Sequence, residues 1–474
     1  MLRYVLKRLL IFLPTLLVIS LLSFGLSKVA PGDPVDLVLR GGLGAAEGAG
    51  GDIRNRERVY QETAAFLGVD KPSFYFALTA AAYPDTLHRI VQKDRRETLR
   101  KLIAQYGNWP KIAAYYQALQ TLEYELFQIP DARRFEGLGI VRSNVRTLYL
   151  QHRDPPIRAL LDSTSMQLQR DTTLKNLVSA AFENVQQCYD NIVSNATPQR
   201  LLIPTLHWYG MDNQYHNWIV GFFQGKFGIS YVDGRPVAHK IYDALYWTVV
   251  MNGISILIAY LLSIPIGVLS AVYKDTRLDR ITTITLFVLY SLPTFWIATM
   301  LVIFFTTPEY GMDWFPTMGV GDMAPDAALW QRLRIRGAHL ILPIFCITYG
   351  SLAFISRQMR GAMLDVLRQD YIRTARAKGL PEQRVIWRHA FRNALFPIIT
   401  LFASVFPAAL AGSVVIEAIF NIPGMGKLSI DAINSRDFPV VYTVLMLSAV
   451  LTMIGILIAD MLYALLDPRV SYSK

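Results

Sequence analysis

The chain has 474 residues, 53% of them hydrophobic, and a mean hydropathy of +0.30. This is more apolar than soluble globular domains usually are, so we expect a membrane protein. The formal net charge of +11 would suit nucleic-acid binding in a soluble protein. In a membrane protein it indicates cytoplasmic loops rich in Lys and Arg, and we expect no nucleic-acid partner. Cys188 and Cys346 provide neither a metal spacing nor a disulfide framework.

The first predicted element is a membrane helix that starts near the N-terminus. Arg3, Lys7 and Arg8 precede an uncharged apolar run at 9–26, which is about the length that a bilayer requires. The sequence APGDP follows at 30–34 in place of a small-residue cleavage site. We therefore interpret the segment as a membrane anchor and not as a cleaved signal peptide.

A polar region follows, from 35 to about 199, and it contains no apolar run of membrane length. Its Gly/Ala-rich tract at 41–51 is typical of a flexible linker. The stretches 86–126 and 163–193 have apolar residues at helical spacing. We predict a mostly helical, extracytoplasmic domain at 41–206, which is of ordinary domain size.

Five further membrane spans are predicted, at 246–273, 281–307, 340–356, 394–416 and 440–459. The basic segments 274–280 and 357–392 lie an even number of spans from the basic N-terminus. The positive-inside rule then places both chain ends in the cytoplasm. The predicted fold is an all-α integral membrane protein with six transmembrane helices and a helical insertion between the first and second spans.

The basic stretch at 371–397 is the strongest local signal. Leu364, Leu367, Tyr371 and Ala375 recur at helical spacing and predict one apolar stripe on a helix. Gly379 then fits a left-handed helix end.

A second short helix is expected after this turn. Pro381 fits a helix start, and Glu382 suits the positive end of the helix dipole. Basic side chains project from both helices, and we expect a partner to bind them: Arg373, Arg376, Lys378, Arg384, Arg388 and Arg392.

The order A-x-x-x-G at 375–379 and N-A-L-F-P at 393–397 resembles the cytoplasmic coupling motif of ABC importer permeases. Arg373 stands where the motif usually begins with Glu, and the spacing to Pro397 is long. In both departures the chain resembles the oligopeptide, dipeptide and nickel branch of the family. The APGDP run and the sequence GKFGISYVDGRPV at 225–237 also resemble this branch. The resemblance implies an ATPase-coupling motif at about 362–397, with these residues: Tyr371, Arg373, Thr374, Ala375, Ala377, Lys378, Gly379, Arg384, Arg388, Asn393 and Pro397.

Two stretches near the C-terminus also resemble this family. The sequence EAIFNIPGMGKL at 417–428 matches its last outer loop, and its proline and glycines fit an irregular or re-entrant turn. Glu417, Pro423, Gly424 and Gly426 are therefore candidates for an outer gate or loop. Asp460 and the sequence DPR at 467–469 match the closing signature. We expect Asp460 to pair with a basic residue, although an acidic residue inside a membrane is a functional candidate by default.

The chain is accordingly expected to divide into an N-terminal segment (1–40), the inserted domain (41–206), a family-like segment (207–245) and the transmembrane domain (246–474). The resemblance implies a multi-pass protein of the bacterial inner (plasma) membrane that transports peptides. The implied partners are a second homologous permease, two ATPase subunits and an extracytoplasmic solute-binding protein.

No catalytic or cofactor-binding motif is present in the sequence. It lacks the P-loop pattern G-x-x-x-x-G-K-[ST], so we expect ATP and magnesium to be bound by the partner ATPases and the chain not to be an enzyme. No metal site is expected, since the histidine spacing does not force ligands to converge.

Two alternative functions remain open at this point. The chain could transport nickel or another small solute of the same branch. It could instead be a membrane-anchored scaffold that acts through its inserted domain.

Overall fold

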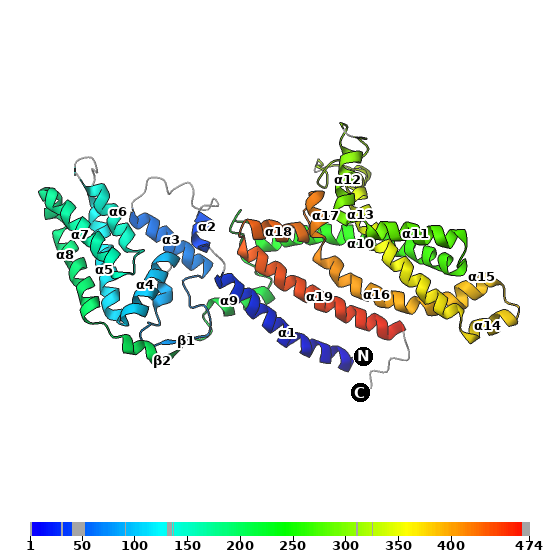
Figure 1. Ribbon diagram of the computed structural model, residues 1–474, viewed down its shortest axis with the longest axis horizontal. Coiled ribbons are helices and arrows are strands. Elements are labelled where there is room, and N and C mark those ends of the chain that lie inside the picture. The colour runs from blue at the N-terminus through cyan, green and yellow to red at the C-terminus, as the bar shows by residue number, and fades with distance from the viewer. Residues whose placement is uncertain are drawn as a thin grey trace. The chain divides into compact units, whose positions relative to one another are not determined.

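The computed structural model describes residues 2–29, 32–39, 53–90, 92–129, 135, 137–309, 311–324 and 326–466. The chain is mostly helical and forms two compact units (Figure 1). Unit 1 comprises 1–30, 226–231 and 235–474, and unit 2 comprises 31–225 and 232–234. The predicted inserted domain at 41–206 lies within the range of unit 2. The predicted linker at 41–51 and the DPR signature at 467–469 lie outside the described residues.

Unit 2 is built from helices with one small sheet. Its elements are α2 (Pro34–Val38), α3 (Ile53–Leu67), β1 (Phe76–Ala80), a 3₁₀ turn (Leu87–Arg89), α4 (Lys93–Tyr106), α5 (Trp109–Gln128), α6 (Leu138–Leu148), α7 (Asp154–Arg170), α8 (Thr172–Ser194), a second 3₁₀ turn (Pro198–Leu202), β2 (Pro204–Trp208) and α9 (Gln214–Phe223).

Helices α4 to α8 surround the core of unit 2. The α8 sequence places buried apolar side chains three and four residues apart, at Leu174, Val178, Phe182, Val185 and Tyr189, which gives the helix one apolar face. Asp171 begins α8 by accepting hydrogen bonds from the backbone N–H groups of the first turn.

A two-stranded antiparallel sheet accompanies these helices, and the sequence analysis did not predict it. Phe76 of β1 pairs with Trp208 of β2, and Ala80 pairs with Pro204. Each strand is five residues long, and the chain between them contains α4 to α8. The strands are therefore too short and too distant in sequence to give a hairpin signal.

Unit 1 contains the long apolar helices. Its elements are α1 (Leu2–Val29), α10 (Val237–Val272), α11 (Arg277–Ser291), α12 (Thr294–Thr306), α13 (Leu329–Leu367), α14 (Asp370–Ala377), α15 (Glu382–Arg384), a π-helical turn (Val385–Ala390), α16 (Phe391–Ala411), α17 (Val414–Ile419), α18 (Met425–Asn434) and α19 (Phe438–Leu466).

Within the part of the chain that the structure describes, four helices are long and apolar enough to cross a membrane, or five if the bent pair α11 and α12 counts as one span. That pair corresponds to the predicted third span, which the structure breaks with a bend of 91°. Leu292 precedes Pro293 and takes an extended conformation, because the proline ring disfavours helical geometry in the residue before it. The predicted span at 281–307 therefore contains a bend at Pro293.

Helices α10 and α13 pack at close range in unit 1. A Cβ atom on Gly267 of α10 would lie 2.6 Å from the backbone oxygen of Ser356 on α13. Ser263 donates a side-chain hydrogen bond to the Leu352 carbonyl at 3.2 Å, and Thr348 donates one to the Ser255 carbonyl at 3.3 Å. Small and hydroxyl-bearing residues are typical of helix interfaces in membranes.

Helices α1 and α19 lie side by side (Figure 1). Arg8 of α1 and Asp460 of α19 form an ion pair across this contact at 2.8 Å. The expected basic partner of Asp460 is thus Arg8, and the pair links the first and last long helices of the unit.

We predict that Gly107 is required for the stability of unit 2. Gly107 ends α4 with φ +68, and a Cβ atom there would overlap the Thr197 carbonyl group. Gly68 has the same φ of +68, but nothing lies within 4 Å of its Cβ position. Gly68→Ala should cost about 1 kcal/mol through backbone strain, and Gly107→Ala about 1–3 kcal/mol more through the added overlap.

Unfolding of the detergent-purified chain, followed by circular dichroism, measures both losses. Equal losses in the two variants would contradict the close contact at Gly107.

Candidate functional site

The predicted coupling motif begins with α14, and its end has the expected geometry. Gly379 has φ +76 and its N–H donates to the Arg376 carbonyl at 2.9 Å. The N–H of Leu380 donates to the Ala375 carbonyl at 3.4 Å. These two bonds form a Schellman motif, which satisfies carbonyls at a helix end. The predicted left-handed end at Gly379 is confirmed.

The predicted apolar stripe through Leu364, Leu367, Tyr371 and Ala375 is wrong in part. Helix α13 ends at Leu367, and Gln369 is extended before α14 begins. This break changes the helical phase, so Ile372 is buried while Tyr371 is 44% exposed. Uniform 3.6-residue periodicity cannot reveal such a break.

The predicted second short helix is also different in the structure. Pro381 precedes α15 as expected, with an extended backbone, and Glu382 lies in the first turn. The helix does not stop, however, but continues through the π-helical turn into α16. The second half of the motif is therefore the start of a long helix, and not an independent element.

The motif has a buried apolar side and an exposed polar side. Ile372, Ala375, Val385, Ile386 and Ala390 belong to a core that includes residues of α10 and α13. The other predicted coupling residues are exposed: Tyr371, Arg373, Thr374, Ala377, Lys378, Gly379, Arg384, Arg388, Asn393 and Pro397. We call the exposed set, with Arg376 and Arg392, the basic turn.

Two side-chain contacts fix the shape of the basic turn. Arg376 donates two hydrogen bonds to the Glu382 carboxylate, at 2.6 and 3.2 Å, and this bonding raises the pKa of Arg376. The Asn393 amide donates to the Tyr371 hydroxyl at 2.8 Å. Both contacts join α14 to the following helix, so the basic side chains project from one connected surface.

An ion pair beside this region was not found by sequence reasoning. Arg360 of α13 donates to both carboxylate oxygens of Asp279, at 2.7 and 2.9 Å. Asp279 also accepts from the Ser270 hydroxyl of α10 and from the backbone N–H of Asp275. Asp279, which is 5% exposed, thus joins α10, α11 and α13 through its carboxylate. From the sequence, the charged residues at 274–280 indicated only a charged loop between two spans. Nothing in the sequence identifies Arg360 as the partner of Asp279.

The predicted outer-gate residues converge on one carboxylate. Glu417 of α17 is fully buried, and its carboxylate accepts from the N–H groups of Ser413 and Lys427 at 3.1 and 2.9 Å. Its Oε1 also accepts from the Thr248 hydroxyl of α10 at 3.1 Å. A carboxylate at the start of α18 suits the positive end of that helix dipole.

Glycines make room for this carboxylate. A Cβ atom on Gly424 would overlap the Glu417 carboxyl group, and one on Gly412 would lie 2.8 Å from its Oε1 atom. A Cβ atom on Gly426 would lie 2.6 Å from the Val414 nitrogen. Pro423 is exposed at the turn. We call Glu417, Gly412, Gly424 and Gly426 the glutamate cradle. Sequence reasoning missed Gly412 and also Thr248, which donates a hydrogen bond to Glu417.

A second buried acidic residue connects two further stretches of unit 1. Asp437, 1% exposed, accepts from the Ser230 hydroxyl and from the Tyr231 N–H, the latter at 2.9 Å. Lys240 of α10 lies 3.4 Å from the same carboxylate. The segment before α10 is thereby attached to the start of α19.

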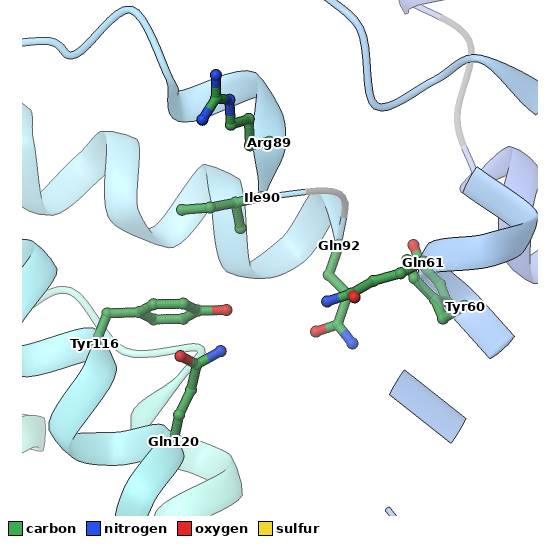
Figure 2. A pocket seen from close by; sticks show the side chains of 7 residues that line it. All are labelled: Tyr60, Gln61, Arg89, Ile90, Gln92, Tyr116 and Gln120. Atoms are coloured by element: carbon green, nitrogen blue, oxygen red, sulfur yellow. The ribbon is translucent and has the colours of Figure 1, made fainter. Parts of the chain in front are cut away.

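Unit 2 contains a small polar pocket of about 100 Å³, in which residues of α3 and α5 and of the stretch 89–92 converge (Figure 2). Small-molecule sites usually measure about 300–1,000 Å³. The pocket is therefore too small for a peptide-sized ligand. Among the described residues, no group of three His, Cys, Asp or Glu could hold a metal ion.

Comparison with known proteins gives a consistent result for the C-terminal half. Residues 263–472 match the family described as "Binding-protein-dependent transport system inner membrane component". The oligopeptide transport system permease protein AppB of Bacillus subtilis is 42% identical over 269 residues, which cover 56% of this chain and 83% of that protein. The di/tripeptide transport system permease protein DppB of Pseudomonas aeruginosa is 35% identical over 291 residues, covering 57% and 84%.

Among solved structures, an inward-facing form of the MetNI methionine ABC transporter matches with a TM-score of 0.37 and 16% identity. The match covers 48% of this chain and 96% of that chain.

We predict that the glutamate cradle tolerates no side chain at Gly424. Gly424→Ala should destabilise unit 1 by about 1–3 kcal/mol, because the new methyl group overlaps the buried carboxylate. Gly253→Ala in α10 is the control, since nothing lies within 4 Å of that Cβ position. The unfolding temperature of the purified chain is the measurement, and a Gly424→Ala variant as stable as the control would refute the cradle.

Proposed function

The chain belongs to the family of binding-protein-dependent transport system inner membrane components, and we propose that it is the permease subunit of an ABC importer for peptides. The peptide substrate is supported by the names of its relatives, which include an oligopeptide permease and a di/tripeptide permease. The observation that carries the proposal is the basic turn, an exposed cationic surface with a fixed shape and an apolar inner side.

We propose that the basic turn is the surface to which an ATPase subunit binds. A side chain held by hydrogen bonds loses little conformational freedom when a partner binds it, and Arg376 and Asn393 are held in this way. The guanidinium and ammonium groups of the basic turn suit a partner surface that carries carboxylates. ATP and magnesium are then bound by the partner ATPases, in agreement with the absence of a P-loop from this sequence.

Transport in this scheme occurs by alternating access. Closure of two ATPases on ATP draws the basic turns of this chain and of a second, homologous permease together. Because the apolar side of the turn packs on α10 and α13, its displacement also moves the long helices. The ATPases can drive the change only if they contact the turn with different energies in the two states. A solute-binding protein on the outer side delivers the peptide.

The proposed topology has six spans with both termini in the cytoplasm. Five come from α1, α10, α13, α19 and the bent pair α11 and α12, and α16 is the sixth. This order places unit 2 outside, and the basic turn inside, where the positive-inside rule expects Lys and Arg. The glutamate cradle then lies near the outer end of the pathway.

The composition of the complex tests this function directly. The chain would be purified from its own membranes in mild detergent, and its partners identified by mass spectrometry. We expect a second permease and P-loop ATPases, and a co-purifying binding protein would identify the solute class. Recovery of the chain alone, or with other proteins bound through unit 2, would favour a membrane-anchored scaffold.

We predict that Gly379→Asp uncouples transport without preventing folding. Nothing lies within 4 Å of the Cβ position at Gly379, and Asp tolerates left-handed geometry better than most residues. The variant should insert normally but lose about tenfold or more in ATP-dependent peptide uptake, equivalent to about 1.4 kcal/mol of contact energy. Its carboxylate would pair with neighbouring cations and reduce the attraction for an acidic partner.

Gly379→Asn is the matched control, because it adds a side chain of the same shape without charge. It should retain more uptake than Gly379→Asp in the reconstituted complex. Wild-type uptake by Gly379→Asp would refute the role of the basic turn.

A further inference from the structure

The small sheet of unit 2 has its polarity reversed with respect to a soluble domain. The side chains of one face are exposed and apolar: Phe76 (46%), Leu78 (72%), Leu206 (63%) and Trp208 (71%). They form two cross-strand pairs, Phe76 with Trp208 and Leu78 with Leu206. We call these four residues the apolar sheet face. A sheet with one solvated face normally turns polar residues to water.

The opposite face carries the polar residues. Thr79 and Thr205 pair across the strands there, and His207 pairs with Ala77. The Thr79 hydroxyl oxygen and the His207 Nε2 atom are buried and lack a hydrogen-bond partner. Burying polar atoms without partners is unfavourable. This sheet therefore hides polar groups and exposes large apolar ones, which is favourable only where the exposed face meets an apolar environment.

The sheet is held to α9, the last helix of unit 2 before α10 in the sequence. Gln214 at the start of α9 donates through its side chain to the Val69 and Lys71 carbonyls, which lie shortly before β1. The ring centroids of Phe74 and Tyr215 are 5.1 Å apart. Helix α9 itself exposes Phe223 (67%) and leads toward α10. The apolar sheet face and α9 thus belong to one body, and the chain continues from it into a membrane-spanning helix.

We propose that the apolar sheet face is a membrane-contact surface that seats unit 2 on the bilayer into which the chain is inserted. Its side chains are hydrocarbon, apart from the indole nitrogen of Trp208, and no residue of either strand is charged. Tryptophan is enriched at the membrane interface, where an apolar ring with one polar atom is favoured. A protein partner is less well matched, because protein interfaces combine apolar contact with many hydrogen bonds.

The depth of contact follows from the backbone. A two-stranded sheet has two unpaired edges, and unpaired N–H and C=O groups are not tolerated in the hydrocarbon core. The backbone therefore stays at the level of the headgroups, while the four side chains reach the acyl boundary. This contact goes beyond the proposed transport function, since it assigns a role to unit 2, to which that function gives none.

Depth measurement by spin labelling tests the proposal in the full-length chain. Cys188→Ser and Cys346→Ala remove the native thiols, and a nitroxide is attached at Leu206→Cys or at Leu78→Cys. Met166→Cys on α7 is the matched control, because Met166 is 62% exposed and Leu206 is 63% exposed. Each chain is reconstituted into vesicles of phosphatidylcholine and phosphatidylglycerol. Collision with oxygen, which concentrates in lipid, is compared with collision with a water-soluble nickel chelate.

We expect labels at 206 and 78 to collide with oxygen several-fold more, relative to the nickel chelate, than the label at 166. If both labels collide with the chelate as often as the control does, the face is in water and the proposal is wrong. If both reagents are excluded, protein covers the face and the proposal is equally wrong. Thermal unfolding of each labelled chain, unchanged from the unlabelled one, establishes that the label reports on the native fold.

Discussion

The close contact between α10 and α13 is the constraint on which unit 1 depends. Gly267 allows the two backbones to approach, and hydroxyl groups along the contact satisfy their hydrogen bonds on the facing helix. Acidic residues then attach the remaining parts to this pair: Asp279 holds α11, and Glu417 holds the turn before α18. Asp437 attaches the start of α19 to α10 through Lys240. Each carboxylate receives several donors, which is the condition for a buried charge to be tolerated.

Sequence reasoning predicted the elements better than their contacts. Composition, the apolar runs and the punctuation at Gly379 and Pro381 were sufficient for the membrane class and for the end of α14. The same rules failed where local geometry changes within a continuous pattern, as at the break after Leu367. A periodicity argument treats the whole pattern as one helix, so it does not detect a two-residue break between two helices.

The partners of the buried charges could not be predicted in the same way. Asp279 belongs to the charged sequence segment 274–280, whose acidic and basic residues resemble ordinary charge balance, and its partner Arg360 lies far along the chain. Glu417 was identified through family resemblance, but Thr248 was not, because a threonine in an apolar run carries no distinguishing signal. The reversed sheet of unit 2 was missed for a related reason: alternation reveals two faces of a strand, but it does not say which face is covered.

The π-helical turn at Val385–Ala390 has a mechanical consequence. It joins α15 to α16 in one continuous helical run, so Arg384 and the start of α16 lie on the same element. Helix α14 is joined to α13 through Gln369, whose backbone is extended. The two sides of the basic turn are therefore attached differently, one through a continuous helix and the other through a break between two helices. A force on the basic turn therefore reaches α16 along the helix itself, and reaches α10 and α13 through the side chains of the shared core.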